Sequence, residues 1–559
     1  MFARRLPLLS LLAVAPALTA GEIALQAPDD IAALLRPYLP EEVGNPARLQ
    51  GQLGEILATE GYFSPRFVFE EHAGGWRLGI EPGTRTQVTA VNVTVDGNIE
   101  PKLKAALLDD WRLPVGHPFR QADWNSAKQQ LLADLLAVEH AGARLVDSEA
   151  TIDPEAAQAA LRAHFDAGPR YRFGELRVEG LQRYDADLVR RYNRAVRPGQ
   201  PYREERLNAL QSALQSTPYF ASAQAVLDTE AAETQGDGTV TAPVVVRVRE
   251  APVDRVAYGA GVSSNTGARV EVNYHTADLF RRAWELDSGL RLEQKKQTAY
   301  ADVFLPPDER YRRHSVGAMA ETTDIQGLQT TRFGFGAQTV QQRGSVEQRL
   351  ALNWQQERRD PAGASPVISR ALVPNATWTW REVDSLLDPR HGTVAQGQIG
   401  GGARAALSDQ NFVRLYARLQ HYIPLGRTDT LSLRGEFGAT LADSRLHIPQ
   451  DYLFRAGGAG SVRGYAYQSL GIKEGTAIVG GRYLGIVSAE ATHWLDSQWG
   501  IAAFVDAGDA VDALDKARLA VGYGLGARWR SPAGPIGIDL AYGERTGEVQ
   551  LHFSLAIPF

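Results

Sequence analysis

The chain has 559 residues, a formal net charge of −6 and no cysteine. Its length predicts several domains, and the lack of cysteine excludes disulfide bonds and thiolate metal sites. The mild acidity argues against a dedicated nucleic-acid-binding protein, which presents a basic surface to its partner.

Residues 1–20 (MFARRLPLLSLLAVAPALTA) have the pattern of a secretory signal peptide. Arg4 and Arg5 supply the basic start, and the apolar stretch 6–17 that follows is too short to span a bilayer. Small residues come next, so we expect cleavage after Ala20, with Ala17 as the alternative. The pattern predicts an exported protein. No later run approaches the roughly 18 apolar residues of a transmembrane helix.

Residues 21–252 repeat a pattern in which helical and strand segments alternate. VTVDG at 93–97 recurs as LRVEG at 176–180, and PVGHPF at 114–119 recurs as RPGQPY at 197–202. Both pairs keep the same spacing along the chain, which is hard to obtain by chance. A more divergent copy lies upstream of both. The repeat therefore predicts three similar modules.

Each module is expected to be of the α+β type, in the order strand, helix, helix, strand, strand, with helices covering one face of a small sheet. The expected limits of the three modules are 21–88, 89–170 and 171–252. The exposed edge of such a sheet can accept an extended guest strand through backbone hydrogen bonds, largely regardless of sequence. The alternative is an array that only sets a distance, and the repeat alone does not decide between recognition and spacing.

From residue 253 onward the sequence has the two-residue period of β-strands. Near the chain end, Leu551, Phe553 and Leu555 alternate with His552 and Ser554. About sixteen such strands can be counted, at a spacing that suits strands of roughly 9–11 residues with their turns. A soluble sandwich gives the same alternation. The even number, the strand length and the aromatic residues near strand ends favour a transmembrane antiparallel barrel over 253–559, because a closed barrel satisfies every backbone group in lipid.

One long loop interrupts this pattern between the eleventh and twelfth expected strands. It contains the glycine-rich segment GGAGSVRGYAYQS at 457–469. A glycine-rich loop can cradle a phosphate, but no helix follows these glycines to present its N-terminus, which disfavours that function. A strand motif of the form GxxxFxDxG comes after the loop. Its fixed positions are Gly500, Phe504, Asp506 and Gly508.

Together these features resemble the Omp85 superfamily. In that family the sixth extracellular loop carries a (V/I)RG(Y/F) tip that folds back into the barrel lumen. The matching residues here are Val462, Arg463, Gly464 and Tyr465. The GxxxFxDxG strand is the family's second barrel motif, and the N-terminal repeat resembles its POTRA modules. The resemblance covers the whole chain after the signal peptide and implies the outer membrane of a Gram-negative bacterium, with the modules in the periplasm.

The two motifs predict a contact inside the lumen. A period of two places Phe504 and Asp506 on the inward face, where Asp506 can meet an arginine from the loop. The resemblance adds Glu490, on the preceding strand, as a second acidic partner. We predict that Arg463 pairs with Asp506, Glu490 or both and so locks the loop, because a broken desolvated pair is costly. The alternative is an arginine solvated in a wet lumen, which contributes little.

The two ends of the barrel sequence predict a weak lateral seam where the first strand must meet the sixteenth. Gly259 and Gly261 lie inside the first strand, and interior glycines weaken a strand. Pro558, next to the terminal Phe559, has no N–H to donate to the ladder. We hypothesise that this seam opens toward the bilayer and templates an incoming strand. The alternative is ordinary barrel glycines and a proline outside the ladder.

These features favour an insertase or translocase that assists the assembly or secretion of β-barrel and autotransporter proteins. Three modules before about sixteen strands resemble the TamA branch of the superfamily. That resemblance implies a TamB-type, inner-membrane-anchored periplasmic partner, client outer-membrane or autotransporter proteins, the lipid bilayer as surroundings, and no nucleic acid. A role in envelope phospholipid transport and a substrate-specific outer-membrane channel are the alternatives.

The sequence predicts no enzyme, no catalytic residue, no metal and no cofactor. Outer-membrane hydrolases bring Ser, His and Asp together at the outer strand ends, and no such constellation is present. The histidines of the barrel are scattered without metal-ligand spacing, and we expect them at the membrane interface. They are His391, His421, His447, His493 and His552.

Overall fold

The computed structural model describes residues 22–40, 45–72, 75–531 and 534–555. The predicted signal peptide and two of the seam residues, Pro558 and Phe559, lie outside this part of the chain. The chain divides into two compact units. The first contains two modules and most of the third. The second contains the barrel with residues 180–194, 213–223 and the chain from Val248 onward.

The first module begins with β1 (Glu22–Gln26), α1 (Asp29–Leu35) and α2 (Pro46–Thr59), followed by β2 (Arg66–His72) and β3 (Gly75–Glu81). Its sheet has the order β1-β3-β2. Asn45 caps α2 by accepting a hydrogen bond from the backbone N–H of Arg48 at 3.2 Å. Leu53 and Leu57 of this helix are fully buried against Leu78 of the sheet, so a helical and a strand pattern share one core.

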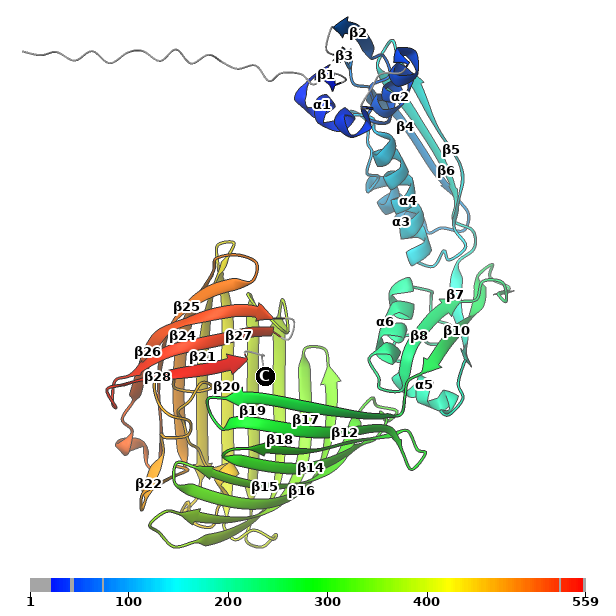
Figure 1. Ribbon diagram of the computed structural model, residues 1–559. Coiled ribbons are helices and arrows are strands. Elements are labelled where there is room, and N and C mark those ends of the chain that lie inside the picture. Colours follow the sequence, from blue (N-terminus) through cyan, green and yellow to red (C-terminus); the bar gives the residue numbers. More distant parts are fainter. Residues whose placement is uncertain (1–21, 41–44, 73–74, 532–533, 556–559) are drawn as a thin grey trace, which may run out of the picture. The chain divides into compact units, whose positions relative to one another are not determined.

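The second module repeats this arrangement with β4 (Gln87–Asp96), α3 (Pro101–Asp109), α4 (Gln121–Ala137), β5 (Arg144–Asp153) and β6 (Gln158–Asp166). The sheet order is β4-β6-β5, and α3 and α4 lie on one of its faces (Figure 1). Trp124, Leu131 and Leu135 recur along α4 at helical spacing and are buried in the module core. The two-residue period of β6 buries Leu161 and Phe165 from the sheet side.

The third module consists of β7 (Tyr171–Glu179), α5 (Ala186–Tyr192), α6 (Glu204–Gln215), β8 (Phe220–Leu227), the short β9 (Glu233–Thr234) and β10 (Val240–Glu250). Its main strands have the order β7-β10-β8. The strand, helix, helix, strand, strand order predicted from the repeat is therefore confirmed in all three modules. No helix among the described residues is long and apolar enough to cross a membrane.

Glu250 at the end of β10 holds the turn after β7. One of its carboxylate oxygens, Oε1, accepts the backbone N–H groups of Gln182, Arg183 and Tyr184 at 2.9, 2.8 and 3.1 Å. Partial burial disfavours the charge of this carboxylate, but the three N–H donors outweigh burial and lower the pKa of Glu250. The chain enters the barrel four residues later, at Asp254.

The barrel is one antiparallel sheet of 16 strands in sequence order, as the sequence predicted. Its strands are β11 (Asp254–Ser263), β12 (Gly267–Leu279), β13 (Trp284–Glu293), β14 (Lys296–Phe304), β15 (Arg313–Ile325), β16 (Leu328–Arg343), β17 (Val346–Pro361), β18 (Val367–Val383), β19 (Gly392–Gly402), β20 (Phe412–Leu425), β21 (Asp429–Leu441), β24 (Tyr483–Trp494), β25 (Trp499–Val511), β26 (Ala520–Ser531), β27 (Gly534–Gly543) and β28 (Glu548–Leu555).

The period of two separates the two faces of this sheet. On β25, Ile501 and Val505 are 52% and 46% exposed on the outer face, whereas Ala502, Phe504 and Asp506 are buried inside. Apolar side chains on the outside and polar ones within are the pattern of a barrel that faces lipid. The Asp506 side chain lies on the inner face of the barrel, as the sequence predicted.

Candidate functional site

The longest connection of the barrel runs from residue 442 to 482, between β21 and β24. It holds the short pair β22 (Ile472–Glu474) and β23 (Ala477–Val479). β11 leaves from the end where the third module joins, and strands alternate in direction, so the eleventh strand β21 delivers this loop to the opposite end. Residues 462–465, called the loop tip here, are all buried.

The loop tip packs so closely on the wall of the barrel that glycines are required on both sides. Gly464 has φ +89°, and a Cβ there would lie 2.8 Å from the backbone of Tyr542. On the wall, a Cβ at Gly522 would lie 1.8 Å from the carbonyl oxygen of Arg463, and one at Gly543 would lie 2.3 Å from that of Gly464. The Tyr465 hydroxyl donates to the carbonyl oxygen of Val521 at 2.9 Å. The tip is therefore seated on β26 and β27.

Arg463 meets Asp506 of β25 through three donors. Its Nε and Nη2 donate to the two carboxylate oxygens at 2.7 and 3.0 Å, and its backbone N–H donates at 3.0 Å. Nη1 also donates to Glu490 of β24 at 2.6 Å. Both acidic partners expected from the sequence thus lie within hydrogen-bonding distance. Asp506 is fully buried and Arg463 is 6% exposed, so neither charge is free in a wet lumen.

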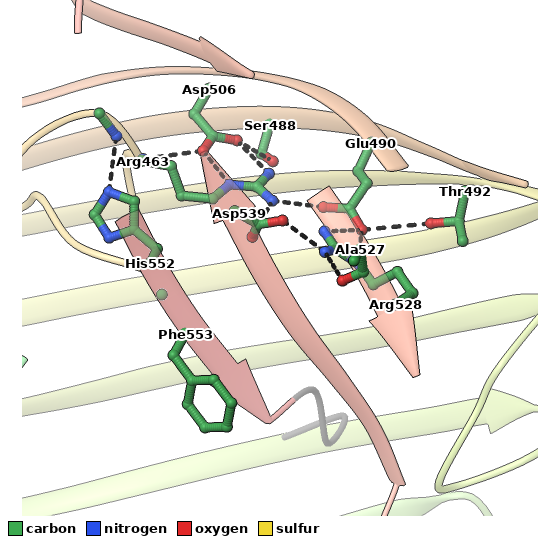
Figure 2. A network of polar contacts seen from close by, with 12 residues as sticks. Arg463, Ser488, Glu490, Thr492, Asp506, Ala527, Arg528, Asp539, His552 and Phe553 are labelled. Atoms are coloured by element: carbon green, nitrogen blue, oxygen red, sulfur yellow. Dashed lines mark hydrogen bonds and ion pairs between the residues drawn. The ribbon is translucent and has the colours of Figure 1, made fainter. Parts of the chain in front are cut away.

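Two further charged residues complete this cluster, and the sequence did not indicate them. Asp539 of β27 accepts from Arg463 Nη1 at 3.2 Å. Arg528 of β26 bridges the two outer acids, contacting Glu490 at 2.8 Å and Asp539 at 2.5 Å. Figure 2 shows the two guanidiniums held among three carboxylates that come from three strands. Bidentate arginine–carboxylate pairing is among the strongest polar contacts available to a protein.

The GxxxFxDxG motif on β25 supplies another part of the wall that receives the loop tip. The Phe504 ring lies 3.4 Å from the Arg463 guanidinium, a cation–π contact. A Cβ at Gly508 would lie 3.1 Å from the Val462 side chain, so this glycine makes room for the tip. Gly500 lies elsewhere, with Trp494 within 2.9 Å of where its Cβ would be. Three of the four fixed positions therefore touch the loop directly.

The last strand also contacts the loop tip. The backbone N–H of Gly464 donates to Nε2 of His552 at 3.0 Å, and His552 is 3% exposed. The expectation that His552 lies at the membrane interface is therefore wrong. The period of two on β28 already placed this residue on the inward face, but its contact with the loop depends on register, because His552 pairs with Asp539 of β27.

A second group of ion pairs holds the outer part of the loop to the opposite wall. Glu474 accepts from Arg359 of β17 at 3.1 Å and from Arg445 at 2.7 Å. Arg359 is 2% exposed. The backbone N–H groups of Thr476 and Ile478 donate to Ala362 and Gln326 at 2.8 and 3.0 Å. The loop is thus fixed both to β24–β28 and to the tips of β15–β17.

β11 and β28 stand at the two ends of the strand order of the barrel sheet. Within the described residues its strand order runs from β11 to β28 without a ladder between these two, and we call this gap the seam. A hydrogen bond crosses it from the backbone N–H of Phe553 to the Oγ of Ser264 at 3.3 Å. Gly259 and Gly261 lie in β11, paired with Glu271 and Arg269 of β12.

The described residues include no group of three or more His, Cys, Asp or Glu side chains arranged to hold a metal ion. The acids of the loop cluster face arginines at 2.5–3.2 Å, which occupy the positions that a cation would take. The geometry fits a structural clamp on the loop rather than a metal site.

Comparison with known families assigns the barrel. Residues 254–559 match the family model described as the Omp85 superfamily domain, which is more than half of the chain. The chain belongs to the Omp85 superfamily. Omp85 proteins are outer-membrane barrels of Gram-negative bacteria, and the three small α+β domains here are POTRA-like. The arginine loop and the GxxxFxDxG strand are the two family motifs that meet in this structure.

Among Omp85 relatives, the outer membrane protein assembly factor BamA of Nitratidesulfovibrio vulgaris is 28% identical over 183 residues. The match covers 31% of this chain and only 22% of that relative. A crystal structure of BamA from Haemophilus ducreyi lacking POTRA domains 1-3 has a TM-score of 0.69 at 16% identity, over 84% of this chain and 99% of that one. CdiB from Acinetobacter baumannii is 12% identical with a TM-score of 0.44, over 94% and 97% of the two chains.

Proposed function

We propose that this Omp85 chain is an outer-membrane insertase or translocase that assists the assembly or secretion of β-barrel and autotransporter proteins. The observation that carries the proposal is that β11 and β28 share no strand ladder among the described residues, beside a loop tip bonded to the last strands. Unpaired N–H and C=O groups at a strand edge each cost several kcal/mol in lipid. A client strand that pairs with either edge removes that cost, so the seam can template its addition.

The lumenal loop lock gives this edge a fixed position. Arg463 ties the loop to β24, β25 and β27, while Glu474 ties it to β17 on the other wall. A loop fastened at both sides braces the barrel across its lumen, and the strands next to the seam are then held at one curvature. In this proposal Arg463, Asp506 and Glu490 lock the loop, and Gly259 and Gly261 weaken β11 at the seam.

The POTRA-like modules are proposed to receive clients before the barrel does. Each of their small sheets has edge strands, and an extended client can add to such an edge through backbone bonds. The resemblance to the TamA branch extends the proposal to a TamB-type, inner-membrane-anchored partner and to modules in the periplasm. Photo-crosslinking from the modules in whole membranes, followed by identification of the captured proteins, tests both partners.

The function itself is tested in lipid vesicles that contain the purified protein. An unfolded outer-membrane barrel is added, and its folding is followed by the mobility shift of folded barrels in unheated gels. We expect faster folding than in empty vesicles. Solute efflux and lipid transfer between vesicles are measured in the same preparation. Unchanged client folding together with stimulated lipid transfer or solute efflux would refute the proposal in favour of phospholipid transport or a diffusion channel.

A further inference from the structure

His552 is the one titratable side chain of β28 that contacts the loop tip among the described residues. Its Nε2 lies 3.0 Å from the backbone nitrogen of Gly464 (Figure 2). A backbone N–H can only donate, so Nε2 must accept, and the imidazole proton is on Nδ1. This contact requires a neutral ring, because an imidazolium has a proton on both nitrogens and no acceptor left.

The neighbouring residue of the same strand crosses the seam. The backbone N–H of Phe553 donates to Ser264, in the turn between β11 and β12, at 3.3 Å. The loop reaches the same place, because Ala466 and Tyr467 line a cavity of about 90 Å³ together with Ser264 and His552. Tyr467 is also held there, since its carbonyl oxygen accepts from Gln326 Nε2 at 3.1 Å. The loop, the last strand and the first turn thus meet at one end of the seam.

Charged groups surround the imidazole from several elements. Asp539 of β27, Asp506 of β25 and Arg463 of the loop interact with it electrostatically. Lys295, from the turn between β13 and β14, lines the same cavity. A proton gained by His552 therefore places a new cation next to Arg463 and turns a donor toward the Gly464 N–H.

We propose that His552 is a positioning residue that couples the loop tip to the seam. In its neutral form it joins the loop tip to β28 while Phe553 joins β28 to the first turn. Protonation of the ring breaks the first bond, so that loop release and movement of the last strand occur together. The inference rests on the proposed function only because it treats the seam as the place where a client strand is added.

Three variants separate the hydrogen bond from the bulk of the side chain. His552→Gln keeps an acceptor but does not titrate, and His552→Phe keeps a ring but has no acceptor. His421→Phe is the matched control, because His421 is a β20 histidine whose partner is Thr393 rather than the loop. Since the chain has no cysteine, a spin label at Ala466→Cys reports on the loop alone. Labels at Val262→Cys and Leu551→Cys, both on the outer face, report the width of the seam.

The measurements use the full-length protein in lipid vesicles between pH 8 and pH 5. We expect His552→Phe to raise the mobile fraction of the loop label about tenfold at pH 8, the effect of one buried hydrogen bond, and to broaden the distance distribution across the seam. The wild type should acquire the same signature as the pH is lowered and the ring takes up a proton. His552→Gln and His421→Phe should resemble the wild type at pH 8, and His552→Gln should not respond to pH.

The inference is overturned if loop mobility and seam width are the same in His552→Phe and the wild type, or if His552→Gln responds to pH as the wild type does. The comparison of His552→Gln with the wild type can be made even if His552→Phe does not fold, because the glutamine keeps a hydrogen-bond acceptor. Neither measurement needs a client protein. Coupling without any acceleration of client folding would refute the proposed function alone, and acceleration without coupling would refute the role of His552 alone.

Discussion

The two acids that bind Arg463 are predicted to differ in importance, and the order follows from their contacts. Asp506 accepts four hydrogen bonds, three from Arg463 and one from Ser488 Oγ at 2.6 Å, and is fully buried. Glu490 accepts one bond from Arg463 at 2.6 Å and one from Arg528 Nε at 3.1 Å, and its side chain is 21% exposed. Asp506→Asn keeps the size of the side chain but removes its charge and turns an amide donor toward a donor of Arg463.

The expected cost of Asp506→Asn is about 3–5 kcal/mol, the usual loss when one partner of a buried pair is removed. Glu490→Gln should cost about 1–2 kcal/mol, because its amide oxygen still accepts from one of the two arginines, Arg528 keeps its pair with Asp539, and water reaches the site. Three carboxylates face two guanidiniums in this cluster, so each neutralised acid also relieves some repulsion among the acids. That relief is shared by both variants and leaves the order unchanged.

The assay is equilibrium unfolding by urea in lipid vesicles, followed by the fluorescence of the 10 tryptophans. Mobility of a label at Ala466→Cys is recorded in parallel, so that loss of the loop contact is seen separately from loss of the barrel. Asp506→Asn should lower the unfolding free energy more than Glu490→Gln and should free the loop. Equal costs for the two variants, or a loop that stays in place in Asp506→Asn, would refute the assignment of Asp506 as the main acceptor.

Two further predictions concern the seating of the loop and the junction with the third module. Gly522→Ala places a methyl group against the carbonyl oxygen of Arg463 and should displace the loop. Gly435→Ala is the control, because no atom lies within 4 Å of its new methyl group. The mobility of the spin label at Ala466→Cys should rise in the first variant and stay unchanged in the second. Glu250→Gln should reduce the protection of amides 182–184 from hydrogen exchange about tenfold at pH 7. The pKa of Glu250 is lower in the folded state than in the unfolded state. Its stabilisation is therefore present above the unfolded-state pKa and is lost as the pH falls through the folded-state pKa. The difference in amide protection between Glu250→Gln and the wild type should vanish in acid.

The sequence predicted those parts of the site that depend on period and motif. A period of two was enough to point Phe504 and Asp506 inward, and the family resemblance supplied Glu490 as a partner for Arg463. It did not indicate Arg528 or Asp539, because their meeting depends on the stagger between β26 and β27, where Asp539 lies opposite Gly526. Register across a barrel is set by the whole sheet rather than by any one strand.

The outer part of the loop was missed for a different reason. Glu474 belongs to a two-stranded hairpin whose strands have three residues each, too short for a period to be recognised. Its partner Arg359 lies 115 positions earlier in the sequence. The alternation along β28 placed His552 on the inward face, but its contact with the loop tip could not be predicted without the register between the strands. The modules and the number of strands, in contrast, followed from repeat and pattern alone.

The proposed insertion of client strands at the seam is tested most directly by closing the seam reversibly. Ser264→Cys and Phe553→Cys join β28 to the first turn at the point where the Phe553 backbone already contacts Ser264, and Val316→Cys with Ala337→Cys, a pair that is already opposed in the sheet, serves as the control. The measurement is the rate of client folding in vesicles with each disulfide formed and then reduced. We expect that the oxidised seam pair stops acceleration and that reduction restores it, while the control pair has no effect. Full acceleration with the seam disulfide closed would refute the proposed role of the seam.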